Sequence, residues 1–524
     1  MQGYLSLVLH AHLPFIRQPE HGRFLEETWL FEAITETYIP LLQLLEKWEK
    51  DRLKARLTLS LTPTLCSMLS DSLLRERYRK RLDGLIKLAE KEMERTAWER
   101  AFNELAVLYH ARLLATRAYY DSVDHDLVTA FREMHERGRL EIIMSAATHA
   151  VLPLLAQHPT SLRAQILIGR DHYRSTFGCE PRGIWIPECA YSPELDSVLQ
   201  EAGLRWFIVE THGILLARPR PRGATFAPIL SPSGTAAFGR DRESAEQVWS
   251  RKKGYPADPR YRDFYRDIGF DLEVDYLNNY LPAPGQRGFT GFKYYRSNNG
   301  APQKEVYSRR VALEAVAENA GHFVEARRLQ LAKTAEALGR PPILVCPYDA
   351  ELFGHWWYEG PEFLDQVVRN FCREGMISMI TPEDYLQLHS LLQIAAPAAS
   401  SWGEAGYWEV WLNEKNEWIY SELSLAQERM AELAKKFQEP DSLQERGLKQ
   451  AARELLLAQA SDWPFIIRAG TSPDFAEKRV KEHLRHFSRL YQEISDQRIT
   501  APWLKEIEAQ DNIFPDLDYR YWAG

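Results

Sequence analysis

Short apolar segments recur through the first 395 residues, and helix-like segments separate them. Residues 4–12 and 56–62 alternate apolar and polar side chains with a period of two, which is typical of β-strands. Further short apolar runs lie at residues 140–144, 183–186, 206–209, 343–346 and 376–380. This repeating pattern predicts an α/β fold with a parallel sheet of about seven strands.

The spacing of apolar residues changes twice along the chain. Within residues 66–138 it becomes helical amid many charged side chains, which predicts a helical insertion. Beyond residue 395 the strand pattern stops and amphipathic helices continue, so we expect one domain over residues 1–395 and an all-α domain over residues 396–524. Residues 231–247 and 281–300 are rich in Gly, Pro, Ser and Asn, and are predicted to be mobile loops beside the site.

Composition excludes several classes of protein. The 65 Lys and Arg against 73 Asp and Glu give a net charge of −8, which argues against nucleic acid as a partner. No stretch approaches the run of about 18 apolar residues that a membrane span needs. Five cysteines without CxxC spacing argue against a disulfide framework, so we expect a cytoplasmic protein. The aromatic content of 12% is suited to stacking on sugar rings, although most rings belong to the core.

Polar residues gather where the predicted strands end. They are His10, His12, His149, Glu188, Glu210, His212, Asp349 and Glu351. In βα-barrels the carboxyl ends of the strands form the active face, so these residues are predicted to converge. Two histidines on one face of a strand can ligate a metal or hydrogen-bond a polar ligand, and the spacing alone leaves both readings open.

The combination of motifs resembles glycoside hydrolase family 57. The segment His10-Ala11-His12-Leu13-Pro14 matches the family's first motif, and residues 145–149 resemble the second motif of its branching-enzyme subgroup. The motifs of the catalytic pair correspond to Trp185-Ile186-Pro187-Glu188-Cys189-Ala190-Tyr191 and to residues 347–357. Two later segments, Ser401-Trp402-Gly403-Glu404 with Trp411-Leu412-Asn413, and Ser461-Asp462-Trp463-Pro464-Phe465, resemble the helical domain of the α-1,4-glucan branching enzymes.

The resemblance implies a distorted (β/α)7 barrel, an α-glucan substrate, retention of anomeric configuration, and no metal or other cofactor. It assigns Glu188 as the nucleophile and Asp349 as the general acid/base. His10, His12 and His149 are expected to hydrogen-bond the bound sugar. Trp356, Trp402 and Trp411 are expected to contact glucose units, and Arg266 and Asp462 to bind hydroxyl groups.

Two departures from the branching-enzyme pattern predict strong hydrolysis beside branching. Ala236 stands where we expect many branching enzymes to carry a Tyr in a mobile loop over the site, and residues 270–275 lack an expected Trp. Both changes would open the acceptor side to water, because a methyl group neither excludes water nor stacks on a sugar.

Other functions remain open at this stage. Within the same family, an α-amylase or a 4-α-glucanotransferase is the alternative to a branching enzyme of glycogen biosynthesis. A metal-dependent amidohydrolase would use the two strand histidines with His149, His212 and Asp349. A glucan-binding protein without activity is the third alternative.

Overall fold

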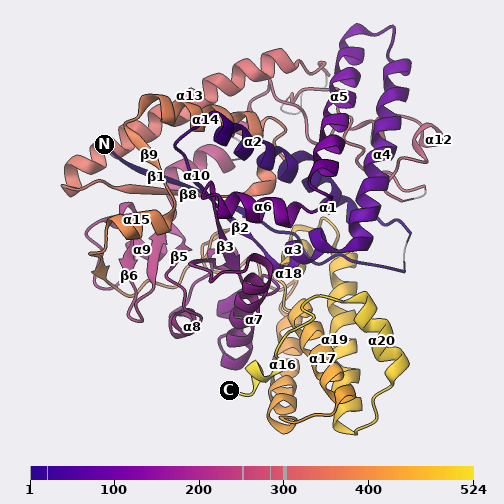
Figure 1. Ribbon diagram of the computed structural model, residues 1–524, viewed down its shortest axis with the longest axis vertical. Coiled ribbons are helices and arrows are strands. Elements are labelled where there is room, and N and C mark those ends of the chain that lie inside the picture. Colours follow the sequence, from indigo (N-terminus) through magenta and orange to yellow (C-terminus); the bar gives the residue numbers. More distant parts are fainter. Residues whose placement is uncertain (1, 21, 251–252, 284, 299–303) are drawn as a thin grey trace.

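The computed structural model describes residues 2–20, 22–250, 253–283, 285–298 and 304–524. Its centre is a curled, mostly parallel sheet with helices around it and a helical bundle against one end (Figure 1). Its strands are β1 (Gly3–Ala11), β2 (Leu57–Leu61), β3 (Leu140–Ser145), β4 (Gly183–Trp185), β5 (Trp206–Val209), β6 (Ile229–Leu230), β7 (Ala236–Gly239), β8 (Ile343–Asp349), β9 (Ile377–Met379) and β10 (Gln393–Ile394).

The sheet closes into a barrel. Its order is β10-β6-β7-β5-β4-β3-β2-β1-β8, and β9 pairs with the start of β1. Arg240, directly after β7, pairs in parallel with Val345 of β8, and the Asp241 N–H donates to the Val345 carbonyl at 2.8 Å. A ring of seven strands results, formed by β1, β2, β3, β4, β5, β7 and β8, so the predicted distorted (β/α)7 barrel is confirmed.

Burial on both faces explains the composition of the strands. All nine residues of β1 are buried, because the barrel interior covers one face and the outer helices cover the other. The helices that surround the barrel are α1 (Glu27–Ala33), the π-helical segment η1 (Ile34–Tyr38), α2 (Ile39–Lys50), α7 (Pro159–Phe177), α8 (Leu195–Glu201), α9 (Thr211–Leu215), α10 (Arg242–Trp249), α13 (Arg309–Leu338), α14 (Gly360–Glu374) and α15 (Pro382–Leu388).

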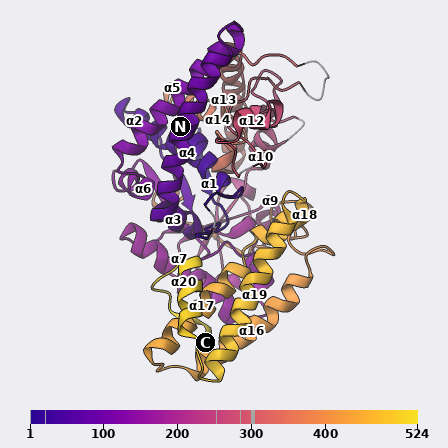
Figure 2. The same cartoon turned by 90° about the vertical axis from the view of Figure 1, so that its right-hand side faces the viewer.

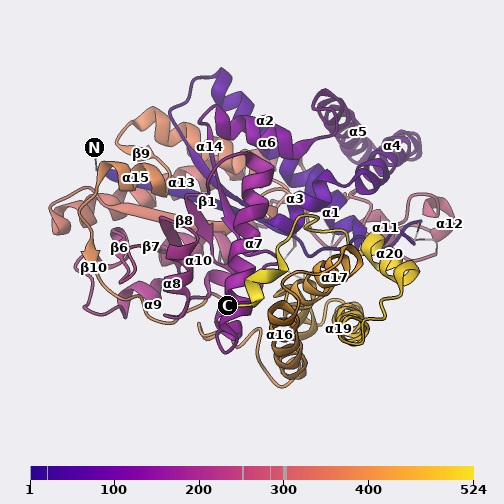
Figure 3. The same cartoon turned by 60° about the horizontal axis from the view of Figure 1, so that its bottom comes forward.

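Helices fill the segment between β2 and β3. They are α3 (Pro63–Ser70), α4 (Ser72–Arg95), α5 (Arg100–Ser122) and α6 (Leu127–Glu136). The long helices α4 and α5 lie side by side and extend beyond the barrel (Figures 1 and 3). The short helices α11 (Ile268–Asp271) and α12 (Val274–Leu277) lie in the connection between α10 and α13.

Five helices form most of the C-terminal region: α16 (Trp418–Lys436), α17 (Ser442–Ala458), α18 (Asp462–Ala469), α19 (Pro473–Ser495) and α20 (Ala501–Gln510). They pack into a bundle below the barrel in Figure 2. The turn between α17 and α18 contacts the barrel directly. Ala460 forms an isolated antiparallel β-bridge with Ala150, and the Ser461 N–H donates to the His149 carbonyl at 3.1 Å. None of the helices built from described residues is both long and apolar enough to cross a membrane.

The structure corrects one predicted loop. Residues 231–247 contain β7 and most of α10, and Ala236 is the first residue of β7, with 2% of its surface exposed. Ala236 pairs with Trp206 at the start of β5 and packs in a cluster with Trp206 and Tyr385, so it does not lie in a loop over the site. Small residues allow this close packing, because a side chain on Gly239 would meet Thr225 and Ile214.

The other predicted loop, residues 281–300, contains no helix or strand among its described residues. Residues 284, 299 and 300 of that prediction lie outside the described part of the chain.

Candidate active site

Glu188 follows β4 on a turn with unusual backbone geometry. Its φ angle is 61° and that of Cys189 is 49°, so two consecutive residues other than glycine adopt the left-handed conformation. Such strain costs on the order of 1–3 kcal/mol per residue and is typical of functional sites. The main chain is fixed there by the Trp402 N–H, which donates to the Glu188 carbonyl at 2.9 Å.

Both oxygens of the Glu188 carboxyl group accept hydrogen bonds. The Trp402 indole N–H donates to Oε2 at 2.6 Å, and the Ser461 hydroxyl donates to Oε1 at 2.9 Å. Burial raises the pKa of Glu188 to about 7, against these two hydrogen bonds, which lower it. The C-terminal helical bundle therefore supplies part of the immediate environment of this carboxylate.

A chain of hydrogen bonds runs from Glu188 into the barrel. His149 Nδ1 lies 2.8 Å from Ser461 Oγ, His149 Nε2 lies 2.9 Å from His10 Nε2, and His10 Nδ1 lies 3.1 Å from Ser60 Oγ. Because Ser461 donates to Glu188, it accepts from His149 Nδ1–H; His149 Nε2 then accepts from His10 Nε2–H, and His10 Nδ1 accepts from Ser60. This assignment needs both rings neutral, and burial lowers the pKa of His10 and of His149 well below the usual value.

His12 lies beside this chain, and its pKa shifts in the opposite direction to that of His10 and His149. Its Nε2 lies 3.0 Å from an Asp462 oxygen, and its Nδ1 lies 3.0 Å from Thr62 Oγ1. Burial is the largest single effect and lowers the pKa of His12, but the Asp462 carboxylate and then the charges of Glu188 and Glu351 together raise it above the usual value. The His12 and Asp462 side chains are 10% and 15% exposed, so neither is fully buried.

Asp349 ends β8, next to His10 in the register of β1 and β8. Its side chain accepts no hydrogen bond from any described residue, unlike that of Glu188. Burial, and then the charges of Glu351 and Glu188, raise the pKa of Asp349 well above its usual value, while Arg240 opposes them. The two carboxyl groups thus occupy electrostatically different environments.

An open cleft of about 630 Å³ lies next to this pair, lined by Glu210, His212, Arg240, Trp249, Trp402 and neighbouring residues. Arg240 forms an ion pair with Glu210 at 2.9 Å and lies over the Trp402 ring at 5.4 Å. Trp356 is 43% exposed, and its ring lies 5.9 Å from that of Trp249. Exposed rings beside charged groups suit a polyhydroxylated ligand.

Comparison with known proteins identifies the family. The sequence model described as Glycosyl hydrolase family 57 matches residues 6–396, and the one described as 1,4-alpha-glucan branching enzyme, C-terminal, matches residues 422–522. The chain belongs to glycosyl hydrolase family 57.

Relatives of this family 57 protein include enzymes with two different names. A 1,4-alpha-glucan branching enzyme of Thermococcus kodakarensis is 33% identical over 98% of this chain and 78% of its own length. The alpha-amylase AmyC from Thermotoga maritima is 41% identical to this chain in sequence. Its crystal structure superposes with a TM-score of 0.94 and covers 100% of this chain and 99% of its own. A family 57 branching enzyme from Pyrococcus horikoshii is 33% identical, with a TM-score of 0.89 over 100% and 97%.

The structure differs from the sequence predictions for several residues of this family 57 protein. Trp411 is only 2% exposed and packs against Val151 and Ala190, so its ring has no free face for a sugar. Both ring nitrogens of His10 and of His149 already have protein partners, so these two histidines support Glu188 rather than facing a ligand.

The side chain of Arg266 also contacts residues outside the predicted site. Its guanidinium forms an ion pair with Asp271 and lies 5.6 Å from the Tyr295 ring, within the connection between α10 and α13. None of its contacts among the described residues reaches Glu188 or Asp349.

Sequence reasoning missed three residues of the site: Tyr38, Arg240 and Ser461. Glu351 is among the polar residues that it placed at the strand ends. Ser461 stands inside a quoted motif, next to the predicted site residue Asp462, which is the signal that could have drawn attention to it. Tyr38 and Arg240 carry no comparable signal, because only the fold brings them to the carboxyl groups.

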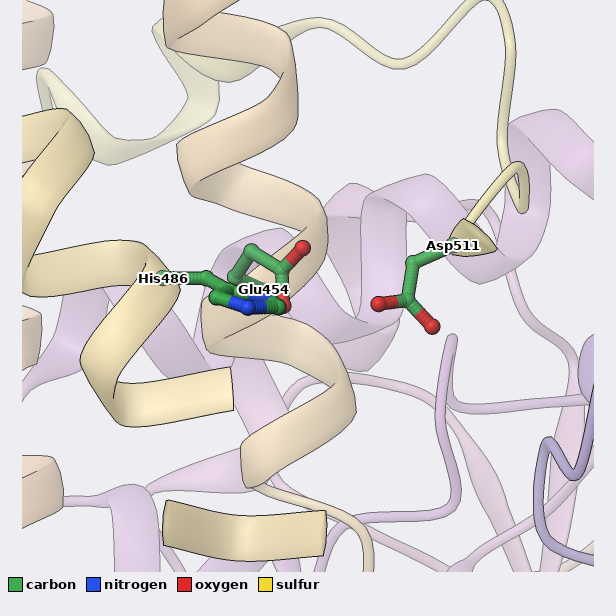
Figure 4. Close-up of side chains that lie close together, drawn as sticks. All are labelled: Glu454, His486 and Asp511. Atoms are coloured by element: carbon green, nitrogen blue, oxygen red, sulfur yellow. The ribbon is translucent and has the colours of Figure 1, made fainter. Parts of the chain in front are cut away.

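Among the described residues, the one group with metal-ligand spacing is Glu454, His486 and Asp511 in the helical bundle (Figure 4). Protein groups already contact its carboxylates, since Arg479 forms an ion pair with Asp511 at 3.1 Å and His483 Nδ1 lies 2.7 Å from a Glu454 oxygen. His149, His212 and Asp349, the ligands that an amidohydrolase would need, do not form such a group in the described structure.

Proposed function

We propose that this family 57 protein is a retaining α-glucan enzyme in which Glu188 is the nucleophile and Asp349 the general acid/base. The observation that carries the proposal is the contrast between their environments. Two donors stabilise charge on Glu188, whereas Asp349 has no donor and lies beside negative charges. A pair of carboxyl groups with proton affinities driven apart is what acid-assisted double displacement requires.

In the first step, a Glu188 oxygen bonds to the anomeric carbon as the glycosidic bond breaks, and Asp349 gives its proton to the leaving oxygen. In the second step, Asp349 takes a proton from the acceptor hydroxyl, whose oxygen displaces Glu188 from the anomeric carbon. Water as acceptor gives hydrolysis, and the 6-hydroxyl of a second glucan chain gives an α-1,6 branch.

We assign α-1,4-glucans such as amylose, starch or glycogen as substrates, and branching with appreciable hydrolysis as the reaction. Support comes from the branching enzymes among the relatives and from the match of residues 422–522 to a branching-enzyme domain. In this proposal Trp356 contacts glucose units, Trp402 borders the donor site from the cleft wall, and His12 with Asp462 binds hydroxyl groups.

An α-amylase is the second candidate, and a specific observation favours it. The amylase AmyC is more similar to this chain in sequence and in structure than either of the branching enzymes described above.

The cysteine usage noted above supports a reducing compartment, and we place the protein in the cytoplasm; the five thiols are free in the structure.

Incubation with amylose tests both candidates at once. We expect new α-1,6 linkages, measured as chains released by isoamylase, together with new reducing ends. New reducing ends without α-1,6 linkages would identify an α-amylase and overturn branching. The Glu188→Gln and Asp349→Asn variants are the controls, and each should lower both signals at least about 1,000-fold, because each removes one half of the double displacement.

A further inference from the structure

Glu351 lies two residues beyond Asp349 and is held rigidly. The chain leaves β8 in a single turn over Ala350–Leu352, which leaves Glu351 with 4% of its surface exposed. The Tyr38 hydroxyl donates to Glu351 Oε1 at 2.5 Å, and the His12 main-chain N–H donates to the same oxygen at 3.2 Å. Tyr38 ends the π-helical segment η1, a rare geometry that recurs near functional sites.

These contacts favour the ionised form of Glu351. Burial is the largest effect and holds the pKa of Glu351 above its usual value, although the Tyr38 hydroxyl, the His12 N–H and the charge of the His12 ring lower it. The charged groups that face Asp349 are Glu351 after β8, Glu188 after β4 and Arg240 after β7. Of the two carboxylates, Glu351 has the larger effect on Asp349.

We propose that Glu351 is a positioning residue, whose fixed carboxylate keeps Asp349 protonated for departure of the leaving group and makes it a stronger base for the acceptor. The inference rests on the proposed function, since it concerns the acid/base of that reaction.

The two negative neighbours of Asp349 differ in how they behave during the reaction. Glu188 loses its charge when it bonds to the anomeric carbon, so its effect on Asp349 disappears between the two steps. Glu351 forms no such bond and keeps its charge throughout. It therefore maintains the proton affinity of Asp349 when that residue must accept a proton from water or from a glucan hydroxyl.

The test is the pH dependence of kcat/KM for a maltooligosaccharide, with Glu351→Gln as the variant. Loss of the charge should move the alkaline limb toward acid by about one pH unit, because one neighbouring charge shifts a carboxyl pKa by roughly one to three units. For an aryl maltooligoside with a good leaving group, which needs little proton donation, the parent and the variant should have closely similar first-step rates.

Two further variants control for structural damage. Tyr38→Phe removes only one donor to Glu351, so the limb should move in the same direction but by less. Glu383→Gln alters another buried carboxylate, which lies on α15 and pairs with Arg205, and should leave the limb unchanged. A rate lowered equally at every pH in Glu351→Gln, with the limb in its original place, would overturn the proposal.

A readout independent of activity separates this inference from the proposed function. The infrared band of the Asp349 carboxylic acid, identified by its absence from Asp349→Asn, should titrate at lower pH in Glu351→Gln than in the parent. If no α-glucan were cleaved, the proposed function would fail while this titration still tested Glu351. An unshifted titration in a protein that cleaves glucans would overturn the inference alone.

Discussion

At the scale of single residues, the site depends on side chains that come together only in the folded chain. The carboxyl groups Glu188 and Asp349 follow predicted strands, so sequence patterns place them at one edge of the sheet. Ser461 lies 273 residues from Glu188, and its hydroxyl has no periodic or compositional signal. The same is true of Tyr38, whose hydroxyl reaches Glu351 across 313 residues.

Replacement of Ser461 by Ala should weaken the nucleophile. The hydrogen bond from Ser461 to Glu188 Oε1 lowers the pKa of Glu188, so its loss should raise that pKa. The change also interrupts the hydrogen-bond chain to His149. Protonation below the raised pKa removes the nucleophile, so the acid limb of kcat/KM should move to higher pH. A hydrogen bond to a charged group contributes about 1.5–3 kcal/mol, which corresponds to a shift of roughly one to two pH units.

Ser424 offers a matched control. Its hydroxyl also contacts a histidine, with 2.8 Å between Ser424 Oγ and His158 Nε2, but this pair lies apart from the two carboxyl groups. Ser424→Ala should leave the acid limb of the kcat/KM profile in place. An unmoved limb in Ser461→Ala as well would mean that the serine does not stabilise the ionised nucleophile.

At the scale of elements, the strand pattern predicted a parallel sheet of about seven strands but missed β7, the strand that closes the barrel. The segments β1 and β2 alternate over five or more residues, so their period is evident. The strand β7 has four residues, three of them Ala or Gly, and Ser, Gly and Pro precede it. That composition is typical of loops, and only pairing with β5 and burial against Trp206 identify the segment as a strand.

If Ala236 lay in a loop over the site, Ala236→Tyr would favour branching by closing the acceptor side to water. Because Ala236 is buried in β7, we expect the substitution to destabilise the fold instead. A ring at this position would enter the packed cluster with Trp206 and Tyr385, and overpacking costs about 1–3 kcal/mol or more. We expect a lower thermal unfolding midpoint and an unchanged ratio of α-1,6 linkages to reducing ends. A changed ratio at full stability would return Ala236 to the acceptor side. Ala236→Ser, a smaller change, should have a smaller effect on the midpoint.

At the scale of the whole molecule, the helical bundle completes the active site. Ser461 and Asp462, at the start of α18, contact Glu188 and His12 of the barrel. A second contact, away from the cleft, also attaches the C-terminal region to the barrel. The buried Trp522 indole N–H donates to Ser161 Oγ, at the start of α7, at 2.9 Å. A bundle that separates from the barrel should therefore abolish activity even while the strands remain folded.

Trp522→Ala tests this coupling from outside the cleft. Loss of a buried Trp costs about 3–5 kcal/mol, so the bundle should separate from α7 at a lower temperature than in the parent. The midpoint of heat inactivation should fall with that separation, measured by hydrogen exchange in α16–α19, while kcat at low temperature stays near the parent value. Trp98, which is 94% exposed, is the control, and Trp98→Ala should change neither midpoint. If the bundle lost its protection while the enzyme kept turning over glucan, the contribution of Ser461 and Asp462 to the site would be dispensable.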